Sequence, residues 1–265
     1  MFDKGRETDA KQDAKLTRNR RRIWKWFYFL PFYLSTFLPF FVSCRKTKPV
    51  VKMDDKINYG AFYIDGLSSK KWVALTFDDG PRPGVLDKIL ETLKKENVKA
   101  TFFILGSNIK TYPKYVKKYI EYGHEIGNHT YAHLNYYQLK KKKSFEEIEQ
   151  IFSKEIDDTE TVIKKLTGVK PFFMRMPNGF ISPTVRKVAK EKKYVVVNWT
   201  FGCDWNKNTK EELVQKYLRS VKPGAIFLFH EKKITAEALP EIIGGIKKKG
   251  YEIVTLSEIL GITGN

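Results

Sequence analysis

Short apolar runs alternate with amphipathic stretches from Trp72 to the end of the chain. The runs have the length of buried strands and cover 72–77, 100–105, 125–128, 172–176, 194–200, 225–230 and 251–256. Between them, apolar residues recur at the helical period over 85–96, 112–122, 145–166, 183–192, 211–221 and 239–249. This repeated strand–helix order predicts parallel strands joined by crossover helices.

Seven strands in about 190 residues are too few for a complete eight-stranded barrel. We therefore predict an α/β fold, namely a distorted or incomplete (β/α) barrel of about seven parallel strands, rather than a doubly wound sheet. A short lead-in strand is expected near 61–64. No glycine-rich phosphate loop follows the first long run, which argues against nucleotide binding.

The chain before residue 71 has a different character. Residues 1–22 are polar and end in clustered arginines, whereas 23–43 are apolar and aromatic, with Lys25 as the only charge. This segment can just span a bilayer, and it lacks the polar face of a soluble core helix. By the positive-inside rule, the arginines would hold the N-terminus in the cytoplasm. The sequence thus predicts a cytoplasmic basic tail (1–22), a transmembrane signal anchor or lipoprotein signal (23–43), a linker with the lead-in strand (44–70) and an extracytoplasmic domain (71–262).

The end of the apolar segment resembles a bacterial lipoprotein cleavage site. Ser43 precedes Cys44 as in that pattern, but Phe41 stands where Leu is usual, so an uncleaved anchor is the alternative. Either form would tether the domain to a bacterial cell membrane. Cys44 and Cys203 are the only cysteines, and their settings argue against a disulfide between them.

The formal net charge of +19 comes from 49 Lys and Arg against 30 Asp and Glu. It suggests anionic surroundings, such as phospholipid or acidic wall polymer. Most lysines lie among glutamates on predicted helices or in short runs such as 140–143, so solvated helix faces explain them better than a nucleic-acid groove. No basic patch is interleaved with stacking aromatics. We expect a monomer that binds no nucleic acid.

The first long run ends in a hexapeptide with two adjacent carboxylates, Thr76-Phe77-Asp78-Asp79-Gly80-Pro81. Neighbouring ionised carboxylates repel each other, and burial raises their pKa values unless a cation compensates. Asp and Gly-Pro are also ordinary turn residues. The hexapeptide alone therefore fits a turn as well as an active site.

Ionisable side chains gather where the predicted strands end, which is the edge of an α/β barrel that carries chemistry. His129 and His133 are four residues apart, on one face of a predicted helical turn. With one carboxylate they would form a three-ligand site with open positions, which is typical of catalytic zinc. Such a pair can also be two unrelated histidines, but three of the four histidines lie at strand ends. His124 precedes a strand, and we assign it a structural role in the turn.

Two further charged side chains at strand ends call for partners. Arg175 ends an apolar run and needs a carboxylate, for which Asp78 is the natural candidate. Asp204 and His230 could pair likewise, with the carboxylate orienting and charging the imidazole. A surface ion pair and a capping Asp are the plain alternatives.

Taken together, the motifs resemble the polysaccharide deacetylases, the NodB-homology domain of carbohydrate esterase family 4, over roughly residues 70–260. The motifs stand in that family's order and are Thr76–Pro81, the His129/His133 pair, Arg175–Gly179, Asp204–Trp205 and Leu228–His230. The resemblance implies a distorted (β/α) barrel that removes N- or O-acetyl groups from wall polysaccharide or chitin-like chains, using a divalent metal that is usually zinc.

The resemblance also implies a role for the residues around the metal. Asp79, His129 and His133 resemble its ligands. Asp78 resembles the general base that deprotonates the attacking water, and Arg175 would orient it.

The remaining roles concern the leaving group and the substrate. His230 resembles the acid that protonates the leaving amine, with Asp204 setting its charge. Trp205 and Leu228 resemble the apolar wall around the acetyl methyl group. The backbone N–H of Asn178 would complete the oxyanion site.

Two positions depart from the family's pattern. Asn178 stands where Tyr is usual, which changes one wall of the substrate groove. Phe201 stands where many members have an additional Asp, which resembles the branch that includes N-acetylmuramic acid deacetylases.

We therefore predict a membrane-tethered, metal-dependent N-deacetylase of the bacterial envelope, with peptidoglycan as the first candidate substrate. One alternative is a deacylase of another amide, such as a lipid-linked sugar. The other is a non-catalytic glycan-binding protein on the same barrel.

Overall fold

Eight parallel strands form one sheet in residues 57–262, which are those that the computed structural model describes. They are β1 (Phe62–Tyr63), β2 (Trp72–Gly80), β3 (Thr101–Ile104), β4 (Glu125–Asn128), β5 (Phe173–Met174), β6 (Val195–Val197), β7 (Ala225–His230) and β8 (Glu252–Val254). Neighbouring strands follow the order β1-β6-β5-β4-β3-β2-β7, and β8 pairs with β2. Each predicted run overlaps one of these strands, β2 extends three residues past its predicted end, and β1 lies in the expected lead-in segment.

Irregular backbone joins the two ends of this order. The segment after β6 forms a single parallel bridge to β7 between Phe201 and Phe227, and the amide of Leu228 donates to the Phe201 carbonyl at 2.9 Å. On the edge of β2 that faces away from β7, β8 pairs with 72–74 and β3 with 76–80. The fold is therefore an α/β barrel with a distorted sheet, in agreement with the predicted class.

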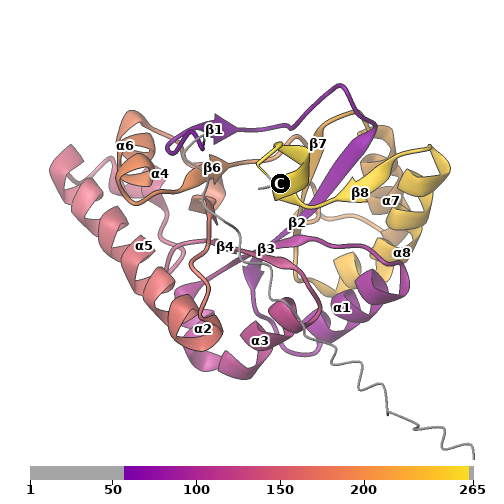
Figure 1. Ribbon diagram of the computed structural model, residues 1–265, viewed down its shortest axis with the longest axis horizontal. Helices are drawn as coiled ribbons and strands as arrows, with labels where there is room; N and C mark the ends of the chain where they lie inside the picture. Colours follow the sequence, from indigo (N-terminus) through magenta and orange to yellow (C-terminus); the bar gives the residue numbers. More distant parts are fainter. Residues whose placement is uncertain (1–56, 263–265) are drawn as a thin grey trace, which may run out of the picture. The chain divides into compact units, whose positions relative to one another are not determined.

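Helices lie outside the strands (Figure 1). The longer ones are α1 (Val85–Lys95), α3 (Pro113–Glu121), α5 (Phe145–Thr167), α6 (Pro183–Glu191), α7 (Lys210–Arg219) and α8 (Lys233–Lys248). Shorter ones are α2 (Gly106–Thr111), α4 (Tyr136–Leu139) and α9 (Leu256–Ile259), and η1 (Pro177–Gly179) is a 3-10 turn. Helices α6, α5 and α3 pack in sequence against one another, as do α1, α8 and α7. The six longer helices match the six predicted stretches.

One helix begins earlier than the sequence pattern predicts. The stretch 239–249 was expected to form the last long helix, but α8 starts at Lys233 and contains Pro240 in its interior. Proline is most frequent in the first turn of a helix, so its position suggests a later start than the structure has.

The alternation of side chains along β2 and β7 places polar groups inside the barrel. On β2, Phe77 belongs to the core under the helices, whereas Thr76 and Asp78 face the opposite side. Strand β7 runs parallel and in register, so Leu228 lies opposite Thr76 and His230 opposite Asp78. Two strands thus present two candidate residues, Asp78 and His230, at the same level of the barrel.

The predicted N-terminal tail, the membrane segment and residues 44–56 of the linker, including Cys44, lie outside the described residues. Within 57–262, no helix combines the length and apolarity needed to cross a membrane. Cys203 is a buried free thiol.

We expect the stacked aromatic rings beneath β2 to dominate stability. Phe77 is fully buried between Phe102 and Phe229, at ring-centroid distances of 4.9 and 5.3 Å. Phe77→Ala should lower the free energy of unfolding by about 3–5 kcal/mol in urea titrations. Phe145→Ala is the matched control, because Phe145 is 75% exposed and its loss should change that free energy by no more than about 0.5 kcal/mol. Equal effects of the two substitutions would contradict this view of the core.

Candidate active site

Arg175 follows β5 and is the largest fully buried side chain of the described residues. Its Nη1 donates to Asp78 Oδ1 and to Thr76 Oγ1, each at 2.8 Å. Its Nε and Nη2 donate at 2.8 Å to the backbone carbonyls of Val197 and Asn198. The guanidinium is therefore hydrogen-bonded through each of its three nitrogens, and it fixes one oxygen of the expected carboxylate partner.

Strand β2 is irregular at the point where its two carboxylates stand. The pairing of β2 with β3 shifts register between Asp78 and Gly80, and Asp79 adopts a left-handed backbone with φ of 67°. An extra residue of this kind redirects a side chain. Asp78 therefore meets Arg175, whereas Asp79 turns toward the histidines.

Asp79, His129 and His133 form a candidate metal site. Asp79 Oδ1 lies 3.6 Å from His129 Nε2 and 3.4 Å from His133 Nε2, and one ligand atom from each residue falls within 4.8 Å of the others. Asp79 Oδ1 is buried and has no hydrogen-bond partner. A divalent cation would satisfy this oxygen, and two imidazole nitrogens with one carboxylate are a donor set that suits zinc.

The tautomer of His129 is set by its second ring nitrogen. Nδ1 lies 2.8 Å from the Arg175 carbonyl, which can only accept, so Nδ1 carries the hydrogen and Nε2 keeps its lone pair toward Asp79. Burial lowers the pKa of His129 by more than the charges of Asp78 and Asp79 raise it. The imidazole is thereby kept neutral, as a metal ligand must be.

The predicted helical turn between the two histidines is wrong. Residues 129–135 form an irregular loop in which Thr130 and His133 have positive φ values of 68° and 53°. The amide of Thr130 donates to Asn128 Oδ1, and Glu155 of α5 accepts from the two amides that follow. These amides are satisfied by side chains instead of helical carbonyls, yet the loop still brings the imidazole rings to a centroid distance of 5.2 Å.

His230 and Asp204 form the second pair. His230 Nδ1 lies 2.7 Å from Asp204 Oδ1, and Asp204 Oδ2 accepts from the His230 amide at 2.6 Å and from Thr235 Oγ1 at 2.7 Å. Burial lowers the pKa of His230. The hydrogen bond and charge of Asp204, with smaller contributions from Asp78 and Asp79, outweigh this effect, so the pKa is raised overall. The net rise favours an imidazolium whose Nε2 is left for another partner.

An apolar wall stands beside His230. Trp205 is 46% exposed and meets the His230 ring edge-on at a centroid distance of 5.7 Å. Leu228 is buried on β7. Gly202 separates them, because a Cβ there would lie 2.9 Å from both Leu228 Cβ and Trp205 Cζ3. The predicted wall residues are thus close together next to His230.

The two positions that depart from the family's pattern have different surroundings. Asn178 is exposed in η1 with φ of 57°, a left-handed conformation that Asn tolerates well. Phe201 forms the bridge to β7 and packs edge-on against Tyr217 at 5.1 Å, so it serves barrel closure. His124 accepts a hydrogen bond from the Ala100 amide at 3.2 Å, which agrees with a structural role.

Sequence reasoning missed two polar residues at the site. Thr76 accepts from Arg175 and donates to the Phe227 carbonyl at 2.7 Å, but its place in an apolar run gives no sign of these partners. Glu231 follows His230 and is 1% exposed, and burial raises its pKa to about 7. Its position directly after a strand-end histidine was the available signal.

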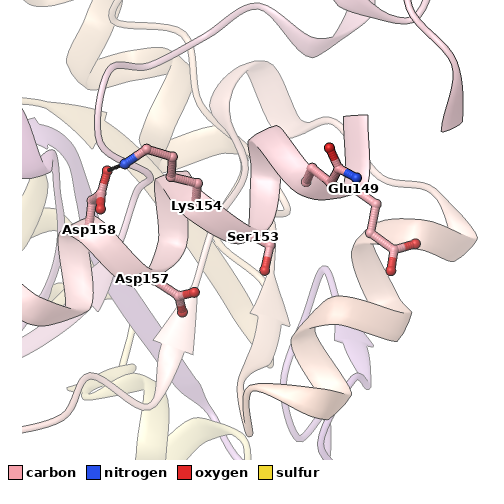
Figure 2. Close-up of a pocket in the computed structure, with 6 residues that line it drawn as sticks. Glu149, Ser153, Lys154, Asp157 and Asp158 are labelled. Atoms are coloured by element: carbon pink, nitrogen blue, oxygen red, sulfur yellow. Dashed lines mark hydrogen bonds and ion pairs between the residues drawn. The ribbon is translucent and has the colours of Figure 1, made fainter. Parts of the chain in front are cut away.

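A surface depression on α5 lies apart from these residues. Figure 2 shows that it is lined by Glu149, Ser153, Lys154, Asp157 and Asp158, with Lys154 ion-paired to Asp158 at 2.6 Å. Asp157 and Glu149 pair with Lys192 and Lys187, respectively. The depression is a salt-bridged helix face and contains none of the candidate site residues.

The polysaccharide deacetylase family model matches residues 65–197. This segment holds the three candidate metal ligands, Asp78 and Arg175, and it ends before Asp204 and His230. More than half of the chain therefore follows the family pattern.

Two relatives illustrate the similarity in sequence. A peptidoglycan-N-acetylglucosamine deacetylase of Bacillus cereus is 36% identical over 202 residues, which are 74% of this chain and 70% of that protein. The peptidoglycan-N-acetylglucosamine deacetylase PgdA of Listeria monocytogenes is 37% identical over 195 residues, which are 73% of this chain but 40% of that protein.

Solved structures share the fold as well. The Bc1960 peptidoglycan N-acetylglucosamine deacetylase has a TM-score of 0.69 at 36% identity, with 77% of this chain and 94% of that one covered. BA3943 of Bacillus anthracis, described as a CE4 family pseudoenzyme, has a TM-score of 0.70 at 32% identity, with 76% and 69% covered. The chain therefore belongs to the polysaccharide deacetylase family of enzymes, the NodB-homology domain of carbohydrate esterase family 4 that its motifs resemble.

Proposed function

We propose that this protein is a metal-dependent N-deacetylase of bacterial envelope polysaccharide, acting on the amino sugars of peptidoglycan. The observation that carries the proposal is the buried, unpartnered Asp79 Oδ1 between two imidazoles, with Asp78 beside it. Relatives named as deacetylases of N-acetylglucosamine and of N-acetylmuramic acid in peptidoglycan support the substrate class.

Asp79, His129 and His133 would hold the cation, for which Zn²⁺ is our choice. A divalent metal at this site supplies Lewis-acid chemistry, since it polarises an amide carbonyl and lowers the pKa of water. The backbone N–H of Asn178 is the proposed additional donor to the oxyanion.

Asp78 is the proposed general base. Arg175 occupies its Oδ1, so Oδ2, which lies 3.6 Å from His129 Nε2, is the oxygen available to accept a proton from the attacking water. Arg175 also places a positive charge 2.8 Å from this buried carboxylate.

His230 is the proposed general acid. Its Nδ1 is engaged by Asp204, so its Nε2 proton can pass to the sugar nitrogen as the C–N bond breaks, which releases acetate and a free amine. Trp205 and Leu228 would bound the acetyl methyl group next to this imidazole.

A non-catalytic glycan-binding role is the second candidate, because BA3943 has this fold and is described as a pseudoenzyme. The fold therefore does not decide between turnover and binding. The proposal of turnover rests on the side chains, since each role above has a residue of suitable chemistry. Location outside the cytoplasmic membrane is part of the same proposal and rests on the apolar segment 23–43.

Removal of the proposed base tests turnover directly. Asp78→Asn should lower acetate release from peptidoglycan or N-acetyl-chito-oligomers by about 10²–10⁴-fold, because an amide cannot take the proton. Asp87→Asn is the control, as Asp87 lies on α1 and pairs with Lys118 at 2.5 Å. Wild-type protein that binds these glycans without releasing acetate would favour the binding role.

Metal removal is the second test. Dialysis against a chelator should abolish acetate release, and added Zn²⁺ should restore it. The reason is that the side chains of the site cannot replace the cation in polarising the amide carbonyl and lowering the pKa of water. Asp79→Asn should not be restored at the same Zn²⁺ concentration. Full activity in protein shown by elemental analysis to be metal-free would refute the metal dependence.

The Asp204–His230 pair predicts a change in pH dependence. Asp204 helps to raise the pKa of His230, so the acid stays protonated to higher pH than an isolated imidazole. Asp204→Asn removes that charge and should move the alkaline limb of the kcat/KM profile to lower pH, with a lower maximum. An unmoved alkaline limb would mean that His230 is not the acid.

A further inference from the structure

Glu231 is a buried acid that the proposed chemistry does not use. It follows His230 at the end of β7 and is 1% exposed. Its Oε1 accepts from the Tyr119 hydroxyl, and its Oε2 from the Arg82 amide, each at 2.5 Å. Tyr119 lies on α3 and is fully buried. One carboxylate thus joins β7 and α3 to the turn that follows β2.

This turn is shaped around the carboxylate. A Cβ on Gly80 would lie 2.3 Å from Glu231 Oε1 and 2.5 Å from the Tyr119 hydroxyl oxygen. Gly80 is not among the residues with positive φ, so the absence of a side chain here serves close approach and not backbone conformation.

The residue before Gly80 has a backbone that needs support. Asp79 has φ of 67°, and a non-glycine residue in this region persists only where its surroundings hold it. Asn108 Nδ2 donates to the Asp79 carbonyl at 2.8 Å from one side. On the other side, Glu231 holds the Arg82 amide, and Arg82 Nη2 lies 3.8 Å from Asp79 Oδ2.

We propose that Glu231 is a positioning residue for the metal site: together with Tyr119 it holds the Gly80–Arg82 turn so that the Asp79 carboxylate faces His129 and His133. The inference rests on the proposed metal-dependent function. Partners that orient a ligand from behind in this way commonly contribute a factor of 10–100 to metal affinity.

Zn²⁺ affinity tests the inference without any glycan. The metal-free full-length chain is titrated against a chromophoric chelator, with Asp79→Asn as the reference for a lost ligand. Glu231→Ala should raise the Kd for Zn²⁺ by about 10–100-fold. Glu231→Gln should raise it less, because its amide oxygen can still accept from the Arg82 amide.

A partly buried acid elsewhere in the barrel, Glu125, separates positioning from stability. Glu125 is the first residue of β4, at the end of that strand away from His129. Its Oε2 accepts from Thr101 Oγ1 at 2.7 Å and from the Leu256 amide at 3.1 Å. Glu125→Ala should lower the thermal midpoint and leave the Kd for Zn²⁺ unchanged. A Glu231→Ala variant that loses thermal stability but keeps the wild-type Kd would overturn the inference.

If Glu231→Ala does not fold, Tyr119→Phe provides a second test of the same inference. It removes one donor to Glu231 and should raise the Kd for Zn²⁺, whereas a folded Tyr119→Phe variant with the wild-type Kd would also overturn the inference. Wild-type protein that binds Zn²⁺ through Asp79 but deacetylates no glycan would reject the proposed activity and leave the role of Glu231 standing.

Discussion

The burial of the Arg175 guanidinium is the constraint on which the site depends. A fully buried cation costs several kcal/mol unless charge and hydrogen bonds compensate. The hydrogen-bond partners of the Arg175 guanidinium come from β2 and from the end of β6. The backbone carbonyl of Arg175 accepts a hydrogen bond from the His129 ring. The guanidinium also lies 4.1 Å from the centre of the Phe103 ring on β3. The strands that form the barrel and the residues that form the site are therefore held by the same group.

This arrangement explains how two adjacent carboxylates can serve different partners. Arg175 compensates the charge of Asp78 from within the barrel, and the bulge after Asp78 turns Asp79 to the rim, where the histidines lie. Each carboxylate thus has its own arginine nearby, since Arg82 Nη2 lies 3.8 Å from Asp79 Oδ2. Repulsion between them is reduced without moving either out of the site.

Periodicity and strand ends predicted the barrel and much of the site, because parallel strands in register bring their carboxyl ends to one edge. The path of the chain between those ends was not predictable in the same way. The loop from His129 to His133 is fixed by Asn128 and by Glu155, which is distant in the sequence. A role for Glu231 could not be predicted, since its partners on α3 and in the β2–α1 turn become neighbours only in the folded barrel.

The irregular closure between β6 and β7 carries two residues of the candidate site. Asp78 and His230 stand opposite each other on the paired strands β2 and β7, whereas Asp204 and Trp205 follow Phe201, which forms one isolated bridge to β7. The proposed acid and base therefore keep their separation through the hydrogen bonds of two neighbouring strands, and the irregular segment contributes only Asp204 and Trp205, which contact the acid from outside that pairing.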